Sequence, residues 1–208
     1  MKGLVSAAVA ALVIGVNGAA VADDGTAERP WSVGASTYAY FVPDAPDFIM
    51  AIVPVDIRLL HLEGRYNYEA PRSGSAFIGA NIRVGEKVRL ALTPMFGGVA
   101  GELDGVIPAL RLTLRWWKLE LTSESEYVFD LDASESSFFY NWSELGIYPL
   151  EWLRAGVVIQ RSLVFQNDLA VQRGLFVSGT YRFVTLTLYE LNLLWTTATW
   201  VLAMSVSF

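Results

Sequence analysis

Hydrophobic and polar residues alternate with a period of two along most of the chain after residue 30. Because successive side chains of a β-strand point to opposite faces, this period predicts strands that each have one apolar face. The clearest case is the stretch from Trp200 to Phe208, in which large apolar side chains alternate with small or hydroxylated ones. The chain is therefore predicted to be all-β.

Turn residues divide the alternating region into about twelve segments. We expect strands at residues 31–41, 48–53, 57–68, 76–84, 88–97, 109–115, 118–129, 138–146, 152–165, 174–182, 184–191 and 197–208. Segment 48–53 is the least regular, because it is apolar throughout and precedes Pro54, which cannot donate to a strand ladder. Ten strands, with this segment as a plug or an extended loop, is the alternative, and eight strands also stays open.

Composition excludes several classes of protein. The chain is 53% hydrophobic, yet no long apolar run follows residue 22, so helical membrane spans are excluded and the apolar surface must be spread over strands. The net charge of −6 argues against a nucleic-acid partner. No linker interrupts residues 31–208, which we expect to form one domain.

The first 22 residues have the build of a secretory signal peptide. Lys2 precedes an apolar stretch from Leu4 to Val16, and the small residues Ala20-Val21-Ala22 form a cleavage site. The stretch is shorter than the roughly 20 residues that a membrane-spanning helix needs. We expect cleavage after Ala22, which leaves residues 23–30 as a short segment in front of the strands.

The C-terminal strand resembles the closing strand of a Gram-negative outer-membrane β-barrel, and its terminal aromatic resembles the signal read by the barrel-assembly machinery. The residues that carry this resemblance are Trp200, Leu202, Met204, Val206 and Phe208. The resemblance implies a transmembrane antiparallel β-barrel in the bacterial outer membrane, exported through the general secretory pathway. It also implies contact with outer-membrane lipids, lipopolysaccharide, the assembly machinery and periplasmic chaperones. The oligomeric state is left open.

In such a barrel the charged face of each strand has to line the lumen, because an Arg or Lys facing lipid costs about 2–4 kcal/mol at the membrane midplane. From Leu60 to Glu69 the faces separate clearly, with Tyr66 and Tyr68 on the apolar side. Leu110, Leu112, Leu114, Leu119 and Leu121 are predicted to face lipid. The residues predicted to form a charge network or a pore lining are His61, Glu63, Arg65, Arg83, Arg89, Arg111, Arg115, Glu120, Glu124, Glu126, Arg154 and Arg182.

The hairpins suggest that one wall of the lumen is rich in arginine. A turn at Trp116-Trp117 would place Arg115 opposite Lys118 and Arg111 opposite Thr122. The neighbouring hairpin would place Arg83 opposite Arg89, a like-charge pair that is destabilising unless an anion or a carboxylate lies between them.

Three functions follow from these patterns. A barrel with a structural or passive small-solute role needs only an Arg and Glu network that fills the lumen. A narrow anion-preferring porin needs a continuous gap beside the Arg wall. A lipid-modifying hydrolase would need His61, the one histidine of the chain, aligned with a serine and an acid, and no catalytic motif surrounds it.

We therefore expect no enzyme, and the sequence carries no motif for a metal or a cofactor. A soluble lipocalin-like barrel is the competing fold, but it would point its large apolar residues inward and its charges outward. This sequence would then expose its leucine rows to water.

Overall fold

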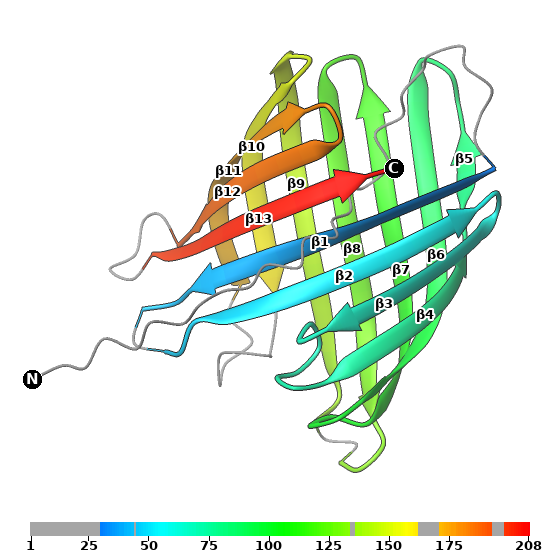
Figure 1. Cartoon of the computed structure of the whole chain (residues 1–208), viewed down its shortest axis with the longest axis vertical. Coiled ribbons are helices and arrows are strands. Elements are labelled where there is room, and N and C mark those ends of the chain that lie inside the picture. Colours follow the sequence, from blue (N-terminus) through cyan, green and yellow to red (C-terminus); the bar gives the residue numbers. More distant parts are fainter. Residues whose placement is uncertain (1–29, 44, 134–135, 162–170, 193–197) are drawn as a thin grey trace, which may run out of the picture.

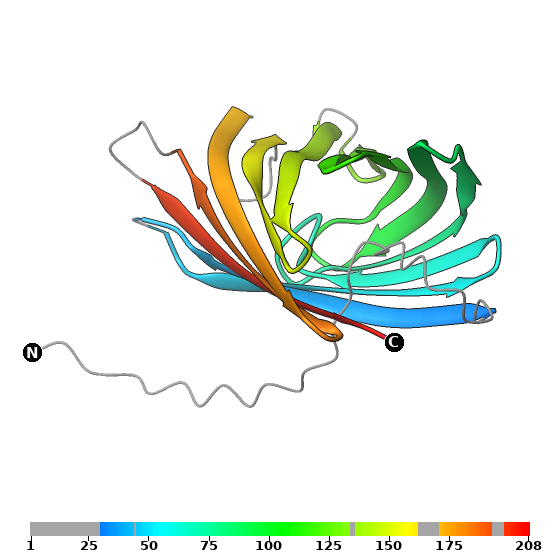
Figure 2. The same ribbon diagram turned by 90° about the horizontal axis from the view of Figure 1, so that it is seen from above.

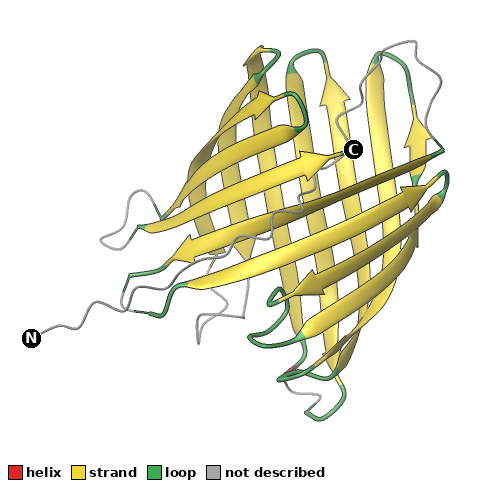
Figure 3. Ribbon diagram, in the orientation of Figure 1, coloured by secondary structure: helices red, strands yellow, loops and turns green. Residues whose placement is uncertain are grey.

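The structure is a computed structural model, which describes residues 30–43, 45–133, 136–161, 171–192 and 198–208. The predicted signal peptide at residues 1–22 lies outside the described residues. Strands make up nearly all of the regular structure (Figure 3). In the described part of the chain, no helix is long and apolar enough to cross a membrane. The strands are β1 (Trp31–Phe41), β2 (Phe48–Ile57), β3 (Leu60–Tyr66), β4 (Gly74–Ala80), β5 (Ile82–Val84), β6 (Val88–Ala100), β7 (Gly105–Trp116), β8 (Leu119–Asp130), β9 (Phe138–Leu150), β10 (Leu153–Arg161), β11 (Val171–Tyr181), β12 (Val184–Leu191) and β13 (Thr199–Ser207).

The strands form one closed antiparallel barrel (Figures 1 and 2). Neighbours in sequence pair with each other, except that β4 and β5 both pair with β6, and β1 pairs with β13 to close the ring. Gly34 lies opposite Ser207 and Phe41 opposite Trp200, and Phe208 exchanges backbone hydrogen bonds with Val33. Closure leaves no open edge, so the backbone donors and acceptors of the sheet find partners within it.

The thirteen strand segments make twelve strands, because β4 and β5 are one strand interrupted by its neighbour. Gly79 of β4 pairs with Met95 of β6, and Ile82 of β5 pairs with Leu92 in the same register. Between these pairs lies Pro94 of β6, which has no N–H to donate. The prediction of about twelve strands is confirmed.

The apolar segment that the sequence left open is part of β2. The strand runs through Pro54 as far as Ile57, and its pairing with β1 is interrupted between Val55 and Ile52, where Pro54 lies. Met50 and Ile52 are buried inside the barrel, whereas Ile49 and Val53 are exposed on its outer wall. The alternatives with ten or eight strands are therefore wrong.

The two ends of the barrel differ in their connections. The end that carries the C-terminus is joined by short turns, and we call it the turn end. Its turns are residues 58–59, 85–87, 117–118, 151–152 and 182–183. The opposite end, which we call the loop end, carries connections such as residues 42–47, 67–73 and 131–137.

One turn lies a residue later than predicted, and this changes the pairing of the charged residues. The hairpin between β7 and β8 turns at Trp117-Lys118, with Trp117 at φ 51°. Arg115 therefore lies opposite Glu120, and Arg111 opposite Glu124, instead of opposite Lys118 and Thr122. Opposite charges now face each other across the hairpin.

The predicted pairing of Arg83 with Arg89 is also wrong. Arg83 lies opposite Ala91, because the ladder between β5 and β6 begins at the pair Val84 and Leu90, beyond the turn in which Gly85 has φ 90°. Arg89 instead lies opposite Arg115 of β7.

The outer wall carries the large apolar residues. Leu110 and Leu121 are 42% and 36% exposed, and Leu112, Leu114 and Leu119 belong to the same outward rows of β7 and β8. This arrangement contradicts the soluble lipocalin-like alternative, in which these rows would be buried. Tyr68 is an exception to the predicted outer row. Asn67, at φ 58°, ends the alternation of β3, and the Tyr68 side chain turns into the barrel, where it is 6% exposed.

The barrel interior is filled by apolar side chains toward the loop end. These residues come from the loop-end halves of their strands and include Tyr40, Met50, Val99, Ile107, Val128, Phe138, Val158, Leu191 and Val201. Ile107, Val128, Leu191 and Val201 are fully buried. We call this set the loop-end core.

The outward rows generate a prediction for Leu188, which is 41% exposed on β12. Leu188→Arg should destabilise the folded barrel in a bilayer by about 2–4 kcal/mol, because it places a charge against lipid. Leu188→Phe keeps an apolar contact and should cost much less. Unfolding by denaturant in lipid vesicles measures both. Equal stability of Leu188→Arg and the parent protein would show that this row does not contact lipid.

Candidate functional site

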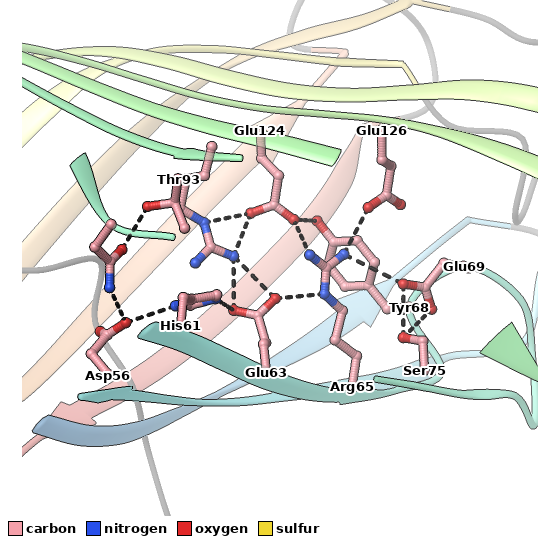
Figure 4. A network of polar contacts seen from close by, with 12 residues as sticks. Asp56, His61, Glu63, Arg65, Tyr68, Glu69, Ser75, Thr93, Glu124 and Glu126 are labelled. Atoms are coloured by element: carbon pink, nitrogen blue, oxygen red, sulfur yellow. Dashed lines mark hydrogen bonds and ion pairs between the residues drawn. The ribbon is translucent and has the colours of Figure 1, made fainter. Parts of the chain in front are cut away.

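Alternation along the strands directs a set of charged side chains into the barrel. His61, Glu63 and Arg65 come from β3, whereas Glu120, Glu124 and Glu126 come from β8. β3 and β8 are not neighbours in the sheet, so contacts between them cross the interior. Figure 4 shows Glu124 and Glu126 of β8 meeting the group from β3 between the walls.

Arg65 is the centre of this cluster, and its side chain is fully buried. Its Nε lies 2.7 Å from Glu63 Oε1, its Nη1 2.8 Å from Glu126 Oε2 and its Nη2 2.8 Å from Glu124 Oε1. The guanidinium also lies over the rings of Tyr68 and Phe77, at 4.4 and 4.2 Å from their centroids. A buried guanidinium requires such partners, because removing it from water costs several kcal/mol.

The loop that follows β3 adds to the cluster from the loop end. The Tyr68 hydroxyl lies 3.2 Å from Glu124 Oε1 and 3.0 Å from the Tyr140 hydroxyl of β9. Ser75 donates a hydrogen bond to the Glu69 carboxylate at 2.8 Å. Burial raises the pKa of the Glu69 carboxyl, and the nearby Arg65 opposes the shift. The loop is thereby tied to strands on both sides of the barrel.

Arg111 connects the carboxylates of the two walls. Its Nη2 lies 2.9 Å from Glu63 Oε2 and 2.7 Å from Glu124 Oε2. Within this part of the interior, two arginines, Arg65 and Arg111, are surrounded by four glutamates, including Glu69 and Glu126. Carboxylates thus outnumber guanidinium groups.

His61 is held between two carboxylates. Its Nδ1 lies 2.7 Å from Asp56 Oδ1, and its Nε2 lies 3.5 Å from Glu63 Oε2. Asp56 also accepts a hydrogen bond of 2.6 Å from Asn81. Among the described residues, no hydroxyl forms a hydrogen bond with His61 Nε2. The serine that a hydrolase would require is therefore missing from the described surroundings of this histidine.

A second group of charges lies nearer the turn end and is centred on Arg154 of β10. Arg154 forms ion pairs with Glu144 and, at 3.0 Å, with Glu120 Oε1. Arg115 approaches the other oxygen of Glu120 at 3.3 Å. Tyr189 donates a hydrogen bond of 2.8 Å to Glu144. Every oxygen of these two carboxylates thus has a polar neighbour.

Three of the predicted lumen arginines do not join either group. Arg83 and Arg182 are exposed and Arg89 is half-buried, and none of the three forms an ion pair with a described residue. Arg182 belongs to a turn, where it lies against the ring of Tyr181.

Two acidic residues, one in each of the two charged groups, were missed by sequence reasoning. Glu144 lies on the inward face of β9, on the same face as Tyr140 and Trp142, so the alternation of that strand could have identified it. Asp56 lies opposite His61 on the neighbouring strand, and only the register shows this.

A polar cavity of about 470 Å³ occupies the interior on the turn-end side of the Arg65 cluster. Hydroxyl groups of β1 and β11–β13 line one side of the cavity, together with Arg182 of the turn between β11 and β12. Charged residues of β3 and β7–β10 line the other side, together with the hydroxyls of Thr113 and Thr122. The lining hydroxyl residues include Ser36, Ser178, Thr180, Thr185, Thr187 and Ser205, and the charged ones are Glu63, Arg111, Glu120, Glu124, Glu144, Arg154 and Arg182. The cavity reaches the turn at Arg182 and Phe183, but its lining includes neither Arg65 nor the fully buried residues of the loop-end core.

The predicted assembly residues Trp200, Leu202, Met204, Val206 and Phe208 form the outward row of β13 and its C-terminus. Trp200, Leu202 and Phe208 are exposed, whereas Val206 is buried. The Phe208 ring lies 5.4 Å from that of Phe183. The outward row of β13 therefore ends, at the turn end of the barrel, in the aromatic pair of Phe208 and Phe183.

Two solved structures are similar to this chain in fold. A KdgM porin superimposes with a TM-score of 0.58 at 10% sequence identity, over 84% of this chain and 99% of the porin. A KdgM porin in complex with disordered oligogalacturonate gives a TM-score of 0.57 at the same identity and coverage. A scan of protein-family models and a search of curated proteins find no match. The chain has the porin-like fold of an outer-membrane β-barrel.

The buried position of Arg65 predicts a large effect of its removal. Arg65→Met should destabilise the barrel by about 3–5 kcal/mol, because it leaves several buried carboxylates without their cation. The matched control is Arg72→Met, since the Arg72 side chain is 78% exposed in its ion pair with Glu102 and should contribute about 0–1 kcal/mol. Denaturant unfolding in vesicles compares the two variants. Equal losses would contradict the central position of Arg65.

Proposed function

We propose that the protein is an outer-membrane β-barrel with a structural or passive small-solute role and not an open channel. Its interior would be a pocket that is closed at the loop end. The observation that supports this most directly is the Arg65 cluster, which joins β3 to β8 across the barrel beneath the loop-end core. Short turns of outer-membrane barrels lie in the periplasm. The turn end and the cavity would then face the periplasm.

Pairing of the interior charges supports a closed pocket rather than an open channel. Each of Arg65, Arg111, Arg115 and Arg154 has a glutamate within ion-pair distance. A guanidinium that is already bonded to carboxylates offers little to a passing anion. The network instead compensates the desolvation of its own members.

A narrow anion-preferring porin is the second candidate. It is favoured by the fold shared with a KdgM porin that was solved in complex with oligogalacturonate, an acidic oligosaccharide. The charges of the cavity lining argue against it, because four glutamates face three arginines. A lumen with this balance would not repel cations.

We propose the same route to the membrane that the termini predict. Residues 1–22 would direct export through the general secretory pathway, and the outward row of β13 that ends at Phe208 would be read by the assembly machinery. Periplasmic chaperones, outer-membrane lipids and lipopolysaccharide would be the partners on this route. No enzymatic activity is proposed.

Conductance in planar bilayers tests the proposed function. The inserted protein should give no stepwise conductance under a salt gradient, because the Arg65 cluster and the loop-end core close the interior. Insertion is verified separately by fractionation into outer membranes and by the heat-dependent migration typical of folded barrels. Stepwise currents with anion preference, reduced in Arg111→Ala, would overturn the closed pocket in favour of the porin.

A further inference from the structure

The outer wall of the barrel has a polar patch where the neighbouring positions are apolar. On β8 the outward row runs from Leu121 through two serines to Tyr127, and on β9 it runs from Phe139 through two polar residues to Leu145. The four flanking residues are exposed on the outer surface. The polar residues between them are Ser123, Ser125, Asn141 and Ser143, which we call the outer polar patch.

Hydrogen bonds join the four side chains into one unit. The Asn141 amide donates to Ser125 Oγ at 2.9 Å and to the backbone carbonyl of Glu124 at 3.0 Å, and it lies 3.2 Å from Ser123 Oγ. Ser143 donates to the Asn141 carbonyl at 3.0 Å, and the hydroxyls of Ser123 and Ser143 lie 2.8 Å apart. The patch is thus held in one arrangement rather than scattered over the surface.

The network leaves hydrogen-bonding capacity unused. A serine hydroxyl offers one donor and two acceptor lone pairs, and an asparagine amide offers two donors and two acceptor lone pairs. Ser125 accepts a hydrogen bond from Asn141, and among the described residues its own hydroxyl donates to no side chain. Lone pairs of the other serines are likewise free, so the patch presents both donors and acceptors to whatever faces it.

The patch lies on the outer wall among apolar positions, where its unused donors and acceptors would face lipid. Lipid tails provide no hydrogen-bond partners, so donors and acceptors left open in the hydrocarbon layer are stabilised by a second protein surface, as polar side chains between membrane helices are. Serine also permits close approach of two backbones, as small residues do at interfaces within membranes. The apolar neighbours Leu112 of β7 and Ile159 of β10 flank the patch on either side.

We propose that the outer polar patch is the contact between two copies of this chain in the membrane, related by a two-fold axis near the pair Ser123 and Ser143. This inference rests on the proposed placement of the barrel in the outer membrane. A two-fold contact requires a surface that is complementary to itself. The patch meets this requirement, because it contains no charge that would repel its own copy and carries donors and acceptors together.

Cysteine cross-linking in membranes tests the contact. The chain has no cysteine, so Ser143→Cys introduces a single thiol at the patch, and Val53→Cys introduces one on the outer face of β2, at a distant part of the ring. We expect Ser143→Cys to form a covalent dimer in outer membranes and Val53→Cys to form none. Equal dimer formation by the two variants, or none by either, overturns the proposal, as does a covalent adduct with a different protein.

A second variant separates the contact from the fold. Ser125→Leu combined with Asn141→Leu makes the patch an ordinary lipid-facing surface, so the barrel should still fold and insert while the mass in detergent falls from two protomers to one. An unchanged mass for this variant, or a single protomer for the parent protein, overturns the inference. A monomer in the outer-membrane fraction leaves the proposed function intact, whereas absence from that fraction overturns both.

Discussion

Closure of the sheet is the constraint on which the rest of the structure depends. In a membrane the backbone groups of a strand cannot turn to water, so each strand needs a neighbour on both sides. The pairing of β1 with β13 satisfies this requirement, and Phe208 completes it through its bonds to Val33. Once the ring is closed, the period of two divides every strand into a residue row toward lipid and a row toward the interior.

The interior row then has to be filled, and the chain fills it in layers. The loop-end core packs apolar side chains, the Arg65 cluster follows with its crossed ion pairs, and the polar cavity occupies the side toward the turns. The middle layer depends on both others. Its charges are kept from water on one side by the core, while Glu63, Arg111 and Glu124 also line the cavity on the other.

Strand positions and faces were predictable from sequence, because they depend on a local period. The rows of Leu110 and Leu121 followed from alternation alone. The register of the strands did not follow from alternation. The turns at Arg58, Trp117 and Arg182 have a residue other than glycine at positive φ, so no typical turn residue in the sequence indicates where the chain reverses. A shift of one residue in a turn sufficed to pair Arg115 with the wrong neighbour.

The candidate site was predictable in part. His61, Glu63, Arg65 and Glu126 could be assigned to the interior from the alternation of their strands. Their contacts join strands that are far apart in the ring, and no local sequence pattern predicts such contacts. Tyr68 was assigned to the wrong face, because Asn67 leaves the strand conformation. Whether the lumen is open depends on which side chains meet across it, so the sequence left the closed pocket and the porin as alternatives.

Thiol accessibility tests the closed pocket most directly. Thr113→Cys places a thiol in the cavity, and Val128→Cys places one in the loop-end core. With a polar thiol reagent that does not cross membranes, we predict labelling of Thr113→Cys from the turn-end side and no labelling of Val128→Cys from either side. Labelling of both positions from the loop-end side would show an open path through the barrel and would contradict the account.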